Sequence, residues 1–300
     1  MARIVAALGG NALGTDPQGQ RERAAATAKA LIELIKQGHE LVISHGNGPQ
    51  VGMIQSATGL PLPECTAMSQ GYIGYHLQNA MEHELHDHGV GLPIIAMVTE
   101  VEVSPDDPAF SDPTKPIGIF LTEDEAKKRM SEDPTVIYKE DSGRGWRKVV
   151  PSPMPIGIIE KDCIIKLIES GCIPITCGGG GIPVVKTGED YRGVEAVIDK
   201  DFASEILAEA VNADYLLILT AVDRVCINFN TPEQQELSEL SVESANALAS
   251  GGHFAAGSML PKVQAAVRFA SSGADRRAVI CSLDNAAKAL SGESGTVINA

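Results

Sequence analysis

The sequence predicts an α/β protein with a mostly parallel sheet that helices cover on both faces. Strand and helix patterns alternate along most of the chain, which favours this class. The first strand, at 4–8, is a run of apolar residues, typical of a parallel strand buried on both faces. Three of the predicted strands run directly into glycine-rich turns. Ligands of open α/β sheets bind at the carboxyl ends of the strands, so we expect the site there.

The composition is that of a globular protein, with 44% hydrophobic and 21% charged residues. The net charge of −15 argues against non-specific binding to nucleic acid and against binding to an anionic membrane surface. A site for an anionic substrate must then be built from local lysines and backbone N–H groups. The six cysteines are scattered, and no apolar run has the length of a membrane span or the form of a signal peptide, so we expect a cytoplasmic protein.

Helices and strands are predicted in turn on both sides of a central proline-rich stretch. Before it, helices are expected at 20–37 and 68–88, with strands at 40–44 and 94–98. After it, the predicted elements are helices at 161–169 and 200–211, strands at 173–177, 215–220 and 278–281, and helices opening near Met259 and Asp284.

The proline-rich stretch at 104–155 is expected to form a small subdomain inserted into the main fold and projecting from it. Thr122 and Glu125 form the pattern of a capping box at the start of a short helix. The segments 136–138 and 146–150 flank a Gly-Arg-Gly turn, which predicts a hairpin. A structureless loop of this length would be unusual within a compact domain.

The three glycine turns are the first sign of chemistry. They are Gly9-Gly10, Gly46-Asn47-Gly48 and the run Gly178–Gly181, each after a predicted strand. In a parallel sheet these turns share one edge, where their N–H groups can surround an extended anionic ligand. Each turn alone could equally be an ordinary strand–helix junction. The P-loop pattern is absent and the dinucleotide fingerprint is only approximated, so neither of those sites is favoured.

Two lysines at predicted helix starts are the next candidates. Lys200 lies between Asp199 and Asp201, and Lys262 comes early in a later helix. A lysine at a helix N-terminus opposes the helix dipole, and a bound phosphate would reverse that balance. The alternative is that both are solvated lysines at helix ends.

Two other groups of residues are weaker candidates. The segment 220–223 directly follows a buried strand and is placed to line a pocket for an adenine ring, although it could be a plain strand-to-loop junction. His83, His86 and His88 invite a metal site, but no further ligand lies at a recognisable spacing, so a solvated helix end is favoured.

Ten segments, in this order along nearly the whole chain, resemble the carbamate kinases of the amino-acid kinase family. Together they are a specific signal, whereas any one of them would be weak. The segments are 7–12, 45–52, 67–75, 107–110, 113–118, 143–153, 177–183, 197–201, 219–223 and 257–262.

The resemblance implies a three-layer αβα open sandwich that acts as a homodimer. It implies a single domain over 1–300, with the inserted subdomain at 104–155, the N-terminal part on the carbamate side and about 173–300 on the nucleotide side. The implied reaction joins MgATP and carbamate to give ADP and carbamoyl phosphate, working toward ATP formation in arginine metabolism. The dimer is further suggested by an apolar helix face near Tyr72, Ile73 and Leu77.

The family's site residues carry over by motif. Lys200 and Lys262 resemble the lysines on the phosphates, and Asp201, with Asp199 less directly, resembles the acid that positions them. The implied turn at the transferred phosphoryl group is Gly9, Gly10 and Asn11; the substrate side comprises Gly46, Asn47, Gly48, Lys115, Gly178 and Gly179; the nucleotide contacts are Thr220, Ala221, Val222, Asp223, Met259 and Lys262. No metal ligand is implied, because Mg²⁺ is expected mainly on the nucleotide phosphates.

Two alternatives remain open from the sequence. One is another phosphotransferase of the amino-acid kinase family, against which the segment 115–118 argues. The other is a non-catalytic paralogue that binds nucleotide, against which the retained lysines argue. The segments 14–19 and 53–59 depart from the family's pattern, which leaves substrate fine-tuning and the dimer contacts open.

Overall fold

The fold is built on one eight-stranded sheet, and the computed structural model describes it over residues 1–9, 16–141 and 143–300. In spatial order the strands are β15 (Glu239–Ser241), β17 (Thr296–Asn299), β16 (Arg277–Ser282), β12 (Tyr215–Thr220), β1 (Arg3–Leu8), β2 (Glu40–His45), β9 (Ile173–Ile175) and β3 (Ile94–Ala96). The strands from β16 to β3 are parallel, and β17 runs antiparallel to β16. The predicted α/β class with a mostly parallel sheet is therefore confirmed.

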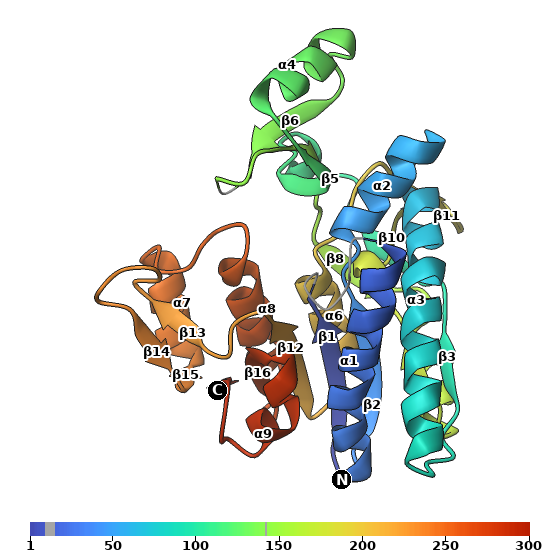
Figure 1. The fold of residues 1–300 in the computed structure, drawn as a ribbon, viewed down its shortest axis with the longest axis vertical. Helices are drawn as coiled ribbons and strands as arrows, with labels where there is room; N and C mark the ends of the chain where they lie inside the picture. Colours follow the sequence, from blue (N-terminus) through green and yellow to red (C-terminus); the bar gives the residue numbers. More distant parts are fainter. Residues whose placement is uncertain (10–15, 142) are drawn as a thin grey trace.

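Helices cover both faces of this sheet (Figure 1). One face packs against α1 (Pro17–Lys36), α3 (Leu62–Asp87) and α9 (Ala286–Leu290), and the other against α5 (Lys161–Glu169), α6 (Lys200–Ala210), α7 (Val242–Ser250) and α8 (Met259–Ser271). The arrangement is the three-layer αβα sandwich that the resemblance implied.

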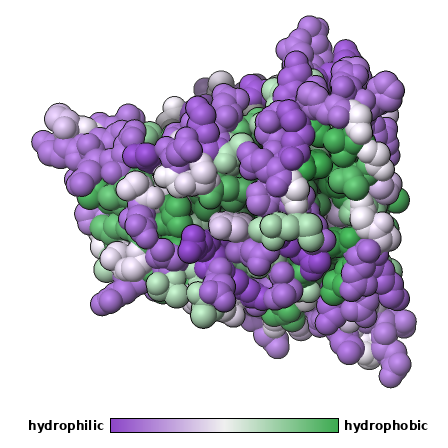
Figure 2. Space-filling model, turned by 90° about the horizontal axis from the view of Figure 1, so that it is seen from below, coloured by the Kyte–Doolittle hydropathy of each residue, from purple (hydrophilic) through white to green (hydrophobic). Residues whose placement is uncertain are grey.

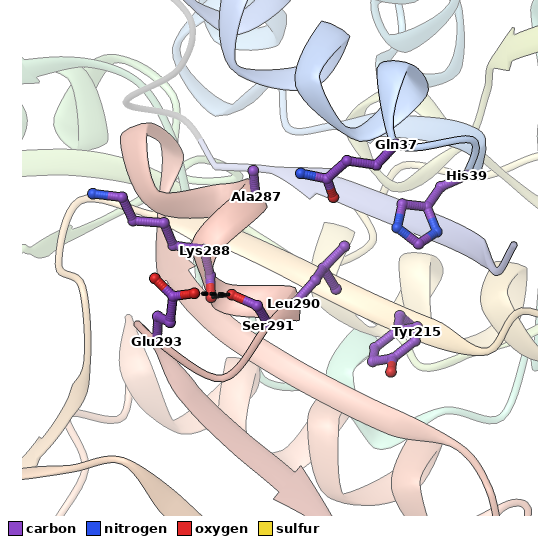
Figure 3. Close-up of a pocket in the computed structure, with 8 residues that line it drawn as sticks. All are labelled: Gln37, His39, Tyr215, Ala287, Lys288, Leu290, Ser291 and Glu293. Carbon is purple, nitrogen blue, oxygen red and sulfur yellow. Dashed lines mark hydrogen bonds between the residues drawn. The ribbon is translucent and has the colours of Figure 1, made fainter.

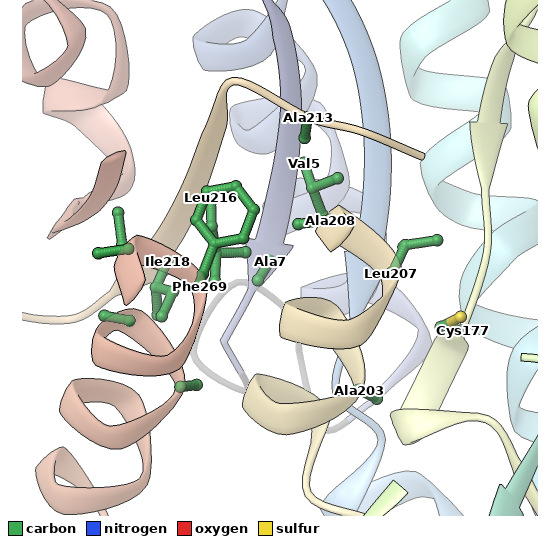
Figure 4. Packing of buried hydrophobic residues seen from close by; sticks show 14 of the residues in the cluster. Val5, Ala7, Cys177, Ala203, Leu207, Ala208, Ala213, Leu216, Ile218 and Phe269 are labelled. Atoms are coloured by element: carbon green, nitrogen blue, oxygen red, sulfur yellow. The ribbon is translucent and has the colours of Figure 1, made fainter. Parts of the chain in front are cut away.

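Strand β1 lies at the centre and is buried on both faces. Ile4 and Leu8 belong to the core beneath α1 and α3, whereas Val5 and Ala7 belong to the core beneath α6 and α8. Figure 4 shows Val5 and Ala7 among the side chains of that second core, with Phe269 of α8 nearby. Successive residues of a strand point to opposite faces, so an unbroken apolar run is what a doubly covered strand needs.

Two small sheets and a hairpin are added to this sandwich. One sheet contains β11 (Asp190–Gly193), β10 (Ile182–Thr187), β4 (Glu100–Val103) and β8 (Pro155–Ile158); the other contains β5 (Lys115–Leu121), β7 (Trp146–Val150) and β6 (Ile137–Glu140); the hairpin is β13 (Val225–Ile227) with β14 (Gln235–Leu237). The sheet of β5, β7 and β6, with helix α4 (Glu123–Glu132), projects from the rest of the molecule in Figure 1. The capping box of Thr122 and Glu125 at α4 and the pairing of β6 with β7 are confirmed.

Helix α2 (Gly48–Thr58) joins the projecting sheet to the main fold. A Cβ placed on Gly52 would lie 2.3 Å from the Cα of Gly118 in β5, so the helix and the strand touch backbone to backbone. The remaining short helices are η2 (Pro108–Phe110), η3 (Gly178–Gly180) and η4 (Leu283–Asn285).

Several predicted elements differ from the observed ones. The long helix begins at Leu62 rather than near Met68, after Pro61, and helix α2 was not predicted. The strand predicted at 173–177 ends at Ile175, because the backbone of Cys177 is left-handed, with a φ of 50°. The predicted apolar face of Tyr72, Ile73 and Leu77 is not free, since Ile73 and Leu77 are buried in the core beneath α3 and Tyr72 packs against it.

Among the described residues, no helix is long and apolar enough to cross a membrane. Seen from below, hydrophilic side chains make up much of the surface, and hydrophobic ones gather in patches between them (Figure 2).

Candidate active site

A cleft of about 880 Å³ lies at the carboxyl ends of β12, β1 and β2. Leu8 pairs with Leu219 on one side and with His45 on the other, so Gly9, Thr220 and Gly46 follow side by side along the edge of the sheet. The predicted site residues that line the cleft are Gly9, Gly46, Asn47, Gly48, Lys115, Gly179, Lys200, Asp201, Thr220, Ala221 and Lys262. Residues from seven separate segments of the chain thus meet at one place.

Asp201 is at the centre of the charged groups in this cleft. Its two carboxylate oxygens accept hydrogen bonds from different lysines, Lys200 Nζ at 2.6 Å and Lys262 Nζ at 2.9 Å. Lys200 and Asp201 occupy the first turn of α6, where the Asp199 side chain caps the helix by accepting from the Asp201 N–H. The helix start therefore fixes one lysine and the acid, and α8 brings the second lysine to that acid.

Burial and the pairing of opposite charges act against each other on the pKa values of these groups. Asp201 is 2% exposed, and although burial alone would raise its pKa, the two adjacent ammonium groups hold that pKa well below its usual range. For Lys262 burial acts to lower the pKa, but Asp201 outweighs it and the pKa is raised. The burial of Lys200 lowers its pKa, an effect that Asp201 opposes only in part. A buried carboxylate between two ammonium groups leaves net positive charge facing the cleft, which suits an anionic ligand.

The projecting sheet contributes basic residues to the lining of the cleft. Lys115, the first residue of β5, donates a hydrogen bond through Nζ to Asp199 Oδ2. Asp199 thus caps α6 through one oxygen and holds Lys115 through the other, which connects the projecting sheet to the start of α6.

Two arginines beside the β6–β7 turn were missed by the sequence analysis. Arg147 and Arg144 line the cleft; both pair with Asp141, at 3.3 and 3.0 Å, and both guanidinium groups lie over the ring of Phe120. Burial lowers the pKa of Arg147, which still carries its charge at neutral pH. The Gly-Arg-Gly-Trp-Arg motif was the available signal, but only the folded hairpin turns these side chains toward the cleft.

The glycine turns differ in how closely they approach their neighbours. A Cβ on Gly9 would lie 2.8 Å from the Leu219 carbonyl oxygen, and one on Gly179 would lie 2.1 Å from Asn47 Nδ2. Gly179 also has a φ of 68°, which residues other than glycine rarely adopt. Both positions therefore require glycine. Gly10 and Asn11, which complete the first predicted turn, lie outside the described residues.

Four predicted site residues do not line the cleft. Gly178 is buried behind Gly179, against His45 and Gln70. The Asp223 carboxylate accepts from Ser282 Oγ, Asn285 Nδ2 and Ser294 Oγ, and although partial burial raises its pKa, these hydrogen bonds lower it to about 2. The Asp223 side chain thus ties β12 to the C-terminal segments. For Val222, Asp223 and Met259 a nucleotide contact stays a prediction.

A second, smaller hollow of about 470 Å³ contains none of the predicted site residues. It is lined by residues of the loop after α1 and of α9, among them His39, Lys288 and Leu290 (Figure 3). The Ser291 hydroxyl there bonds to Glu293.

The described residues around His83, His86 and His88 do not form a set of ligands for a metal ion. Within residues 1–9, 16–141 and 143–300, no group of three or more His, Cys, Asp or Glu side chains could hold a metal ion. His83 and His86 lie 3.4 and 3.5 Å from Asp87, and His88 lies 3.9 Å from Glu84.

Comparison with known proteins agrees with this geometry. The pattern of the Amino acid kinase family matches residues 2–282. This chain belongs to the amino acid kinase family. It is 50% identical to the carbamate kinase of Staphylococcus haemolyticus over 99% of both chains, and 51% identical to the carbamate kinase-like protein YqeA of Escherichia coli over 99% of this chain and 98% of that one.

Solved structures show the same fold. The carbamate kinase of Giardia lamblia bound to AMP-PNP is 43% identical, with a TM-score of 0.89, and the form bound to citric acid has a TM-score of 0.94. Each comparison covers 99% of this chain and 98% of the other. The sandwich and its added sheets thus match those of this family member.

Proposed function

We propose that this protein is a carbamate kinase, which transfers a phosphoryl group between MgATP and carbamate, with ADP and carbamoyl phosphate as the other pair. The observation that carries the proposal is the Lys200–Asp201–Lys262 cluster beside the glycine turns. It is a buried, net positive site in a chain about half identical, over nearly its full length, to enzymes named carbamate kinase.

Carbamate already carries a negatively charged oxygen, so its attack on phosphorus requires no general base. This agrees with a cleft whose described lining contains neither histidine nor cysteine. Phosphoryl transfer then depends on positioning and on neutralising charge that spreads over the transferred group. Ammonium groups that are largely buried and held in place supply that neutralisation without having to reorient during the reaction.

The predicted catalytic residues and Lys115 have separate roles in this proposal. Lys200 and Lys262 neutralise the phosphates, and Asp201 orients both ammonium groups rather than accepting a proton. The N–H groups at Gly9, Gly10 and Asn11 hold the transferred phosphoryl group. Lys115 exchanges its partner Asp199 for the substrate when carbamoyl phosphate binds.

The two substrates occupy different sides of the cleft in this proposal. Gly46, Asn47, Gly48 and Gly179 face the carbamoyl group, and the nucleotide lies along residues of the 173–300 part, including Thr220 and Ala221. The 104–155 segment acts as an inserted subdomain of one domain spanning 1–300. It supplies Lys115 to the carbamate side.

Mg²⁺ would arrive with the nucleotide, where it adds positive charge to the phosphates. The carboxylates that line the cleft already pair with basic side chains, Asp199 and Asp201 with lysines and Asp141 with two arginines. This donor set fits an ion bound mainly by phosphate and water, which is how Mg²⁺ is commonly held. The side chains that touch the phosphates are then the lysines.

We further propose that the enzyme works toward ATP formation in arginine metabolism, in the cytoplasm. The resemblance supports the direction and the pathway. The six cysteines, all free, support a reducing compartment.

We also propose a homodimer, formed through the exposed apolar surface of α3 and of β3 with its flanking residues. This surface comprises Met68, Tyr75, Leu92, Ile95 and Val98, which are 39–63% exposed in one chain. β3 is also an edge strand of the main sheet, and proteins commonly cover or pair such edges. The dimer contact predicted from the sequence was near Tyr72, Ile73 and Leu77. We now place it on this neighbouring exposed surface, because Ile73 and Leu77 are buried in the core.

The first experiment mixes the protein with MgADP and carbamoyl phosphate and measures ATP. We expect rapid ATP formation, and a fall in turnover of about 10²- to 10³-fold in Lys200→Ala or Lys262→Ala, as for loss of one fixed charge donor. Lys29→Ala, an exposed lysine of α1, is the matched control and should behave as wild type.

Two outcomes would contradict this proposal. Wild-type turnover in either site variant would remove those lysines from the mechanism. Binding of MgADP without ATP formation would instead favour a different acceptor or a nucleotide-binding paralogue.

A further inference from the structure

We propose that Ser69 and Gln70 of α3 are positioning residues that hold the carbamate side of the cleft in its binding shape. The inference rests on the proposed function. The segment 67–75 carries part of the family resemblance, yet neither Ser69 nor Gln70 lines the cleft. Both are buried polar side chains, 0% and 3% exposed. A polar side chain in such a position costs stability unless its hydrogen bonds are satisfied, so its partners indicate its role.

Ser69 fixes the orientation of the Asn47 side chain. Its hydroxyl donates to the Thr66 carbonyl at 2.7 Å and accepts from Asn47 Nδ2 at 2.8 Å. Since the single hydroxyl proton is used on Thr66, only an N–H can face the oxygen from the other side. The amide of Asn47 is therefore held with Nδ2 toward Ser69. Asn47 itself lines the cleft and is 2% exposed.

Gln70 fixes the turn that faces Asn47. Its Oε1 accepts from the Thr99 N–H at 2.9 Å, and its Nε2 donates to the carbonyls of Thr99 at 3.1 Å and Gly178 at 2.9 Å. Thr99 continues the network, because its hydroxyl accepts from the Cys177 N–H at 3.2 Å. One side chain thus holds the residue before β4 and the backbone of η3 together.

The two contacts converge on one pair of residues. Asn47 and Gly179 are in close contact in the cleft, and a Cβ on Gly179 would overlap the Asn47 amide. Ser69 holds Asn47, and Gln70 holds the carbonyl of Gly178 next to Gly179. Adjacent residues of a single helix therefore set the distance between two separate walls of the substrate site. A rigid helix supports such a site better than loops that support one another.

The nucleotide side is held by other elements. The lysine cluster belongs to α6 and α8, and within the part of the chain that the structure describes neither Ser69 nor Gln70 forms a hydrogen bond with it. Loss of either α3 side chain should therefore weaken the binding of carbamoyl phosphate and leave the binding of ADP unaffected.

The test measures both KM values for ATP formation in Ser69→Ala and Gln70→Glu. Ser69→Ala removes one buried hydrogen bond to Asn47, which corresponds to about a fivefold to tenfold rise in KM for carbamoyl phosphate. We expect the KM for ADP to stay within about twofold in both variants, since the lysine cluster is intact. Gln70→Glu keeps Oε1 and the size of the side chain but loses two donated hydrogen bonds.

Gln78→Ala is the matched control. Gln78 also lies on α3 and also ties the helix to a backbone, through Oε1 and the Ala96 N–H at 2.9 Å, but far along the helix from the cleft. It should lower the unfolding temperature without changing either KM. An equal rise in KM for carbamoyl phosphate in Gln78→Ala would overturn the inference, since the effect would then be general loosening.

A double-mutant cycle tests the route through Asn47. If Ser69 acts through Asn47, Ser69→Ala has no further effect on KM in an Asn47→Ala background. Additive effects in this cycle, or an unchanged KM in Ser69→Ala alone, would overturn the inference while the proposed function stands. Absence of ATP formation by the wild type would overturn both.

Discussion

At the scale of single residues, His45 shows how burial decides the charge of a side chain beside the cleft. It ends β2 immediately before the Gly46 turn and is 1% exposed. Its Nδ1 donates to the Gly46 carbonyl at 2.9 Å, and its Nε2 faces the backbone of Gly178. Burial lowers the pKa of His45 to about 4, and the positive charge of Lys200 acts in the same direction. The folded protein therefore contains this imidazole in its neutral form at neutral pH.

This lowered pKa predicts acid sensitivity between pH 6.5 and 4. In that range the unfolded chain binds a proton at His45 and the folded chain does not, so stability is complete above pH 6.5 and is lost as the pH falls. The contribution of this one group amounts to roughly 3 kcal/mol. Urea unfolding of wild type and His45→Gln across this range measures it. A slope against pH that is equal in the two proteins would contradict the assignment.

At the scale of elements, the contact between α2 and β5 sets the position of the projecting sheet. Gly52 and Gly118 meet backbone to backbone, and the strand that contains Gly118 begins with Lys115. A shift of β5 therefore moves Lys115 relative to Asp199. The position of the substrate lysine depends on how closely a helix and a strand can approach.

Gly52→Ala should separate these elements. The added methyl would lie 2.3 Å from backbone atoms of Gly118, which cannot rotate away, so β5 must move. Such overpacking costs about 1–3 kcal/mol. We expect a lower unfolding temperature and a KM for carbamoyl phosphate that rises more than the KM for ADP.

Gly91→Ala is the control for Gly52→Ala, because a Cβ there meets nothing within 4 Å and the φ of Gly91 is not positive. It should match wild type in both KM values. Unchanged kinetics in Gly52→Ala would mean that the position of Lys115 does not depend on this contact.

At the scale of the whole molecule, the exposed apolar side chains of α3 and β3 point to assembly. In one chain Tyr75 is 63% exposed, on the opposite face of α3 from Ile73 and Leu77 in the core. Exposed apolar side chains on elements that contact each other, as α3 and β3 do, mark interaction sites more often than scattered apolar residues do. With a net charge of −15, copies of the chain repel one another, so association requires a gain that outweighs this repulsion, and burial of such a surface provides one.

Light scattering should therefore give twice the 31.6 kDa mass of one chain. Tyr75→Glu places a charge in the proposed contact and should shift the protein toward the monomer, because an unpaired buried charge is costly. Phe229→Glu is the matched control: Phe229 is 58% exposed but lies between β13 and β14. A dimer that survives Tyr75→Glu, or that Phe229→Glu disrupts equally, would place the interface elsewhere.

Much of the architecture was readable from local pattern. The helix at 161–169 and the strand at 215–220 have the predicted bounds, and the capping box at Thr122 is present. These features depend on residues a few positions apart, through side-chain periodicity and capping. Helix α2 was missed because the glycines at its start and in its interior are unfavourable for a helix in isolation; its packing against β5 compensates.

The sequence by itself determined the local features of this protein: a first strand buried on both faces, glycine turns at strand ends, and lysines at helix starts. Only the tertiary structure decided which groups pair. It assigned Asp201 to Lys200 and Lys262 and Asp199 to Lys115, and it turned the Asp223 side chain toward the C-terminal segments. Lys200 and Asp201 are neighbours in the chain, but Lys262 lies 61 residues from Asp201, Lys115 lies 84 residues from Asp199 and Asn285 lies 62 residues from Asp223. Local pattern acts over a few residues, and only the crossover connections of the sheet bring these distant segments together.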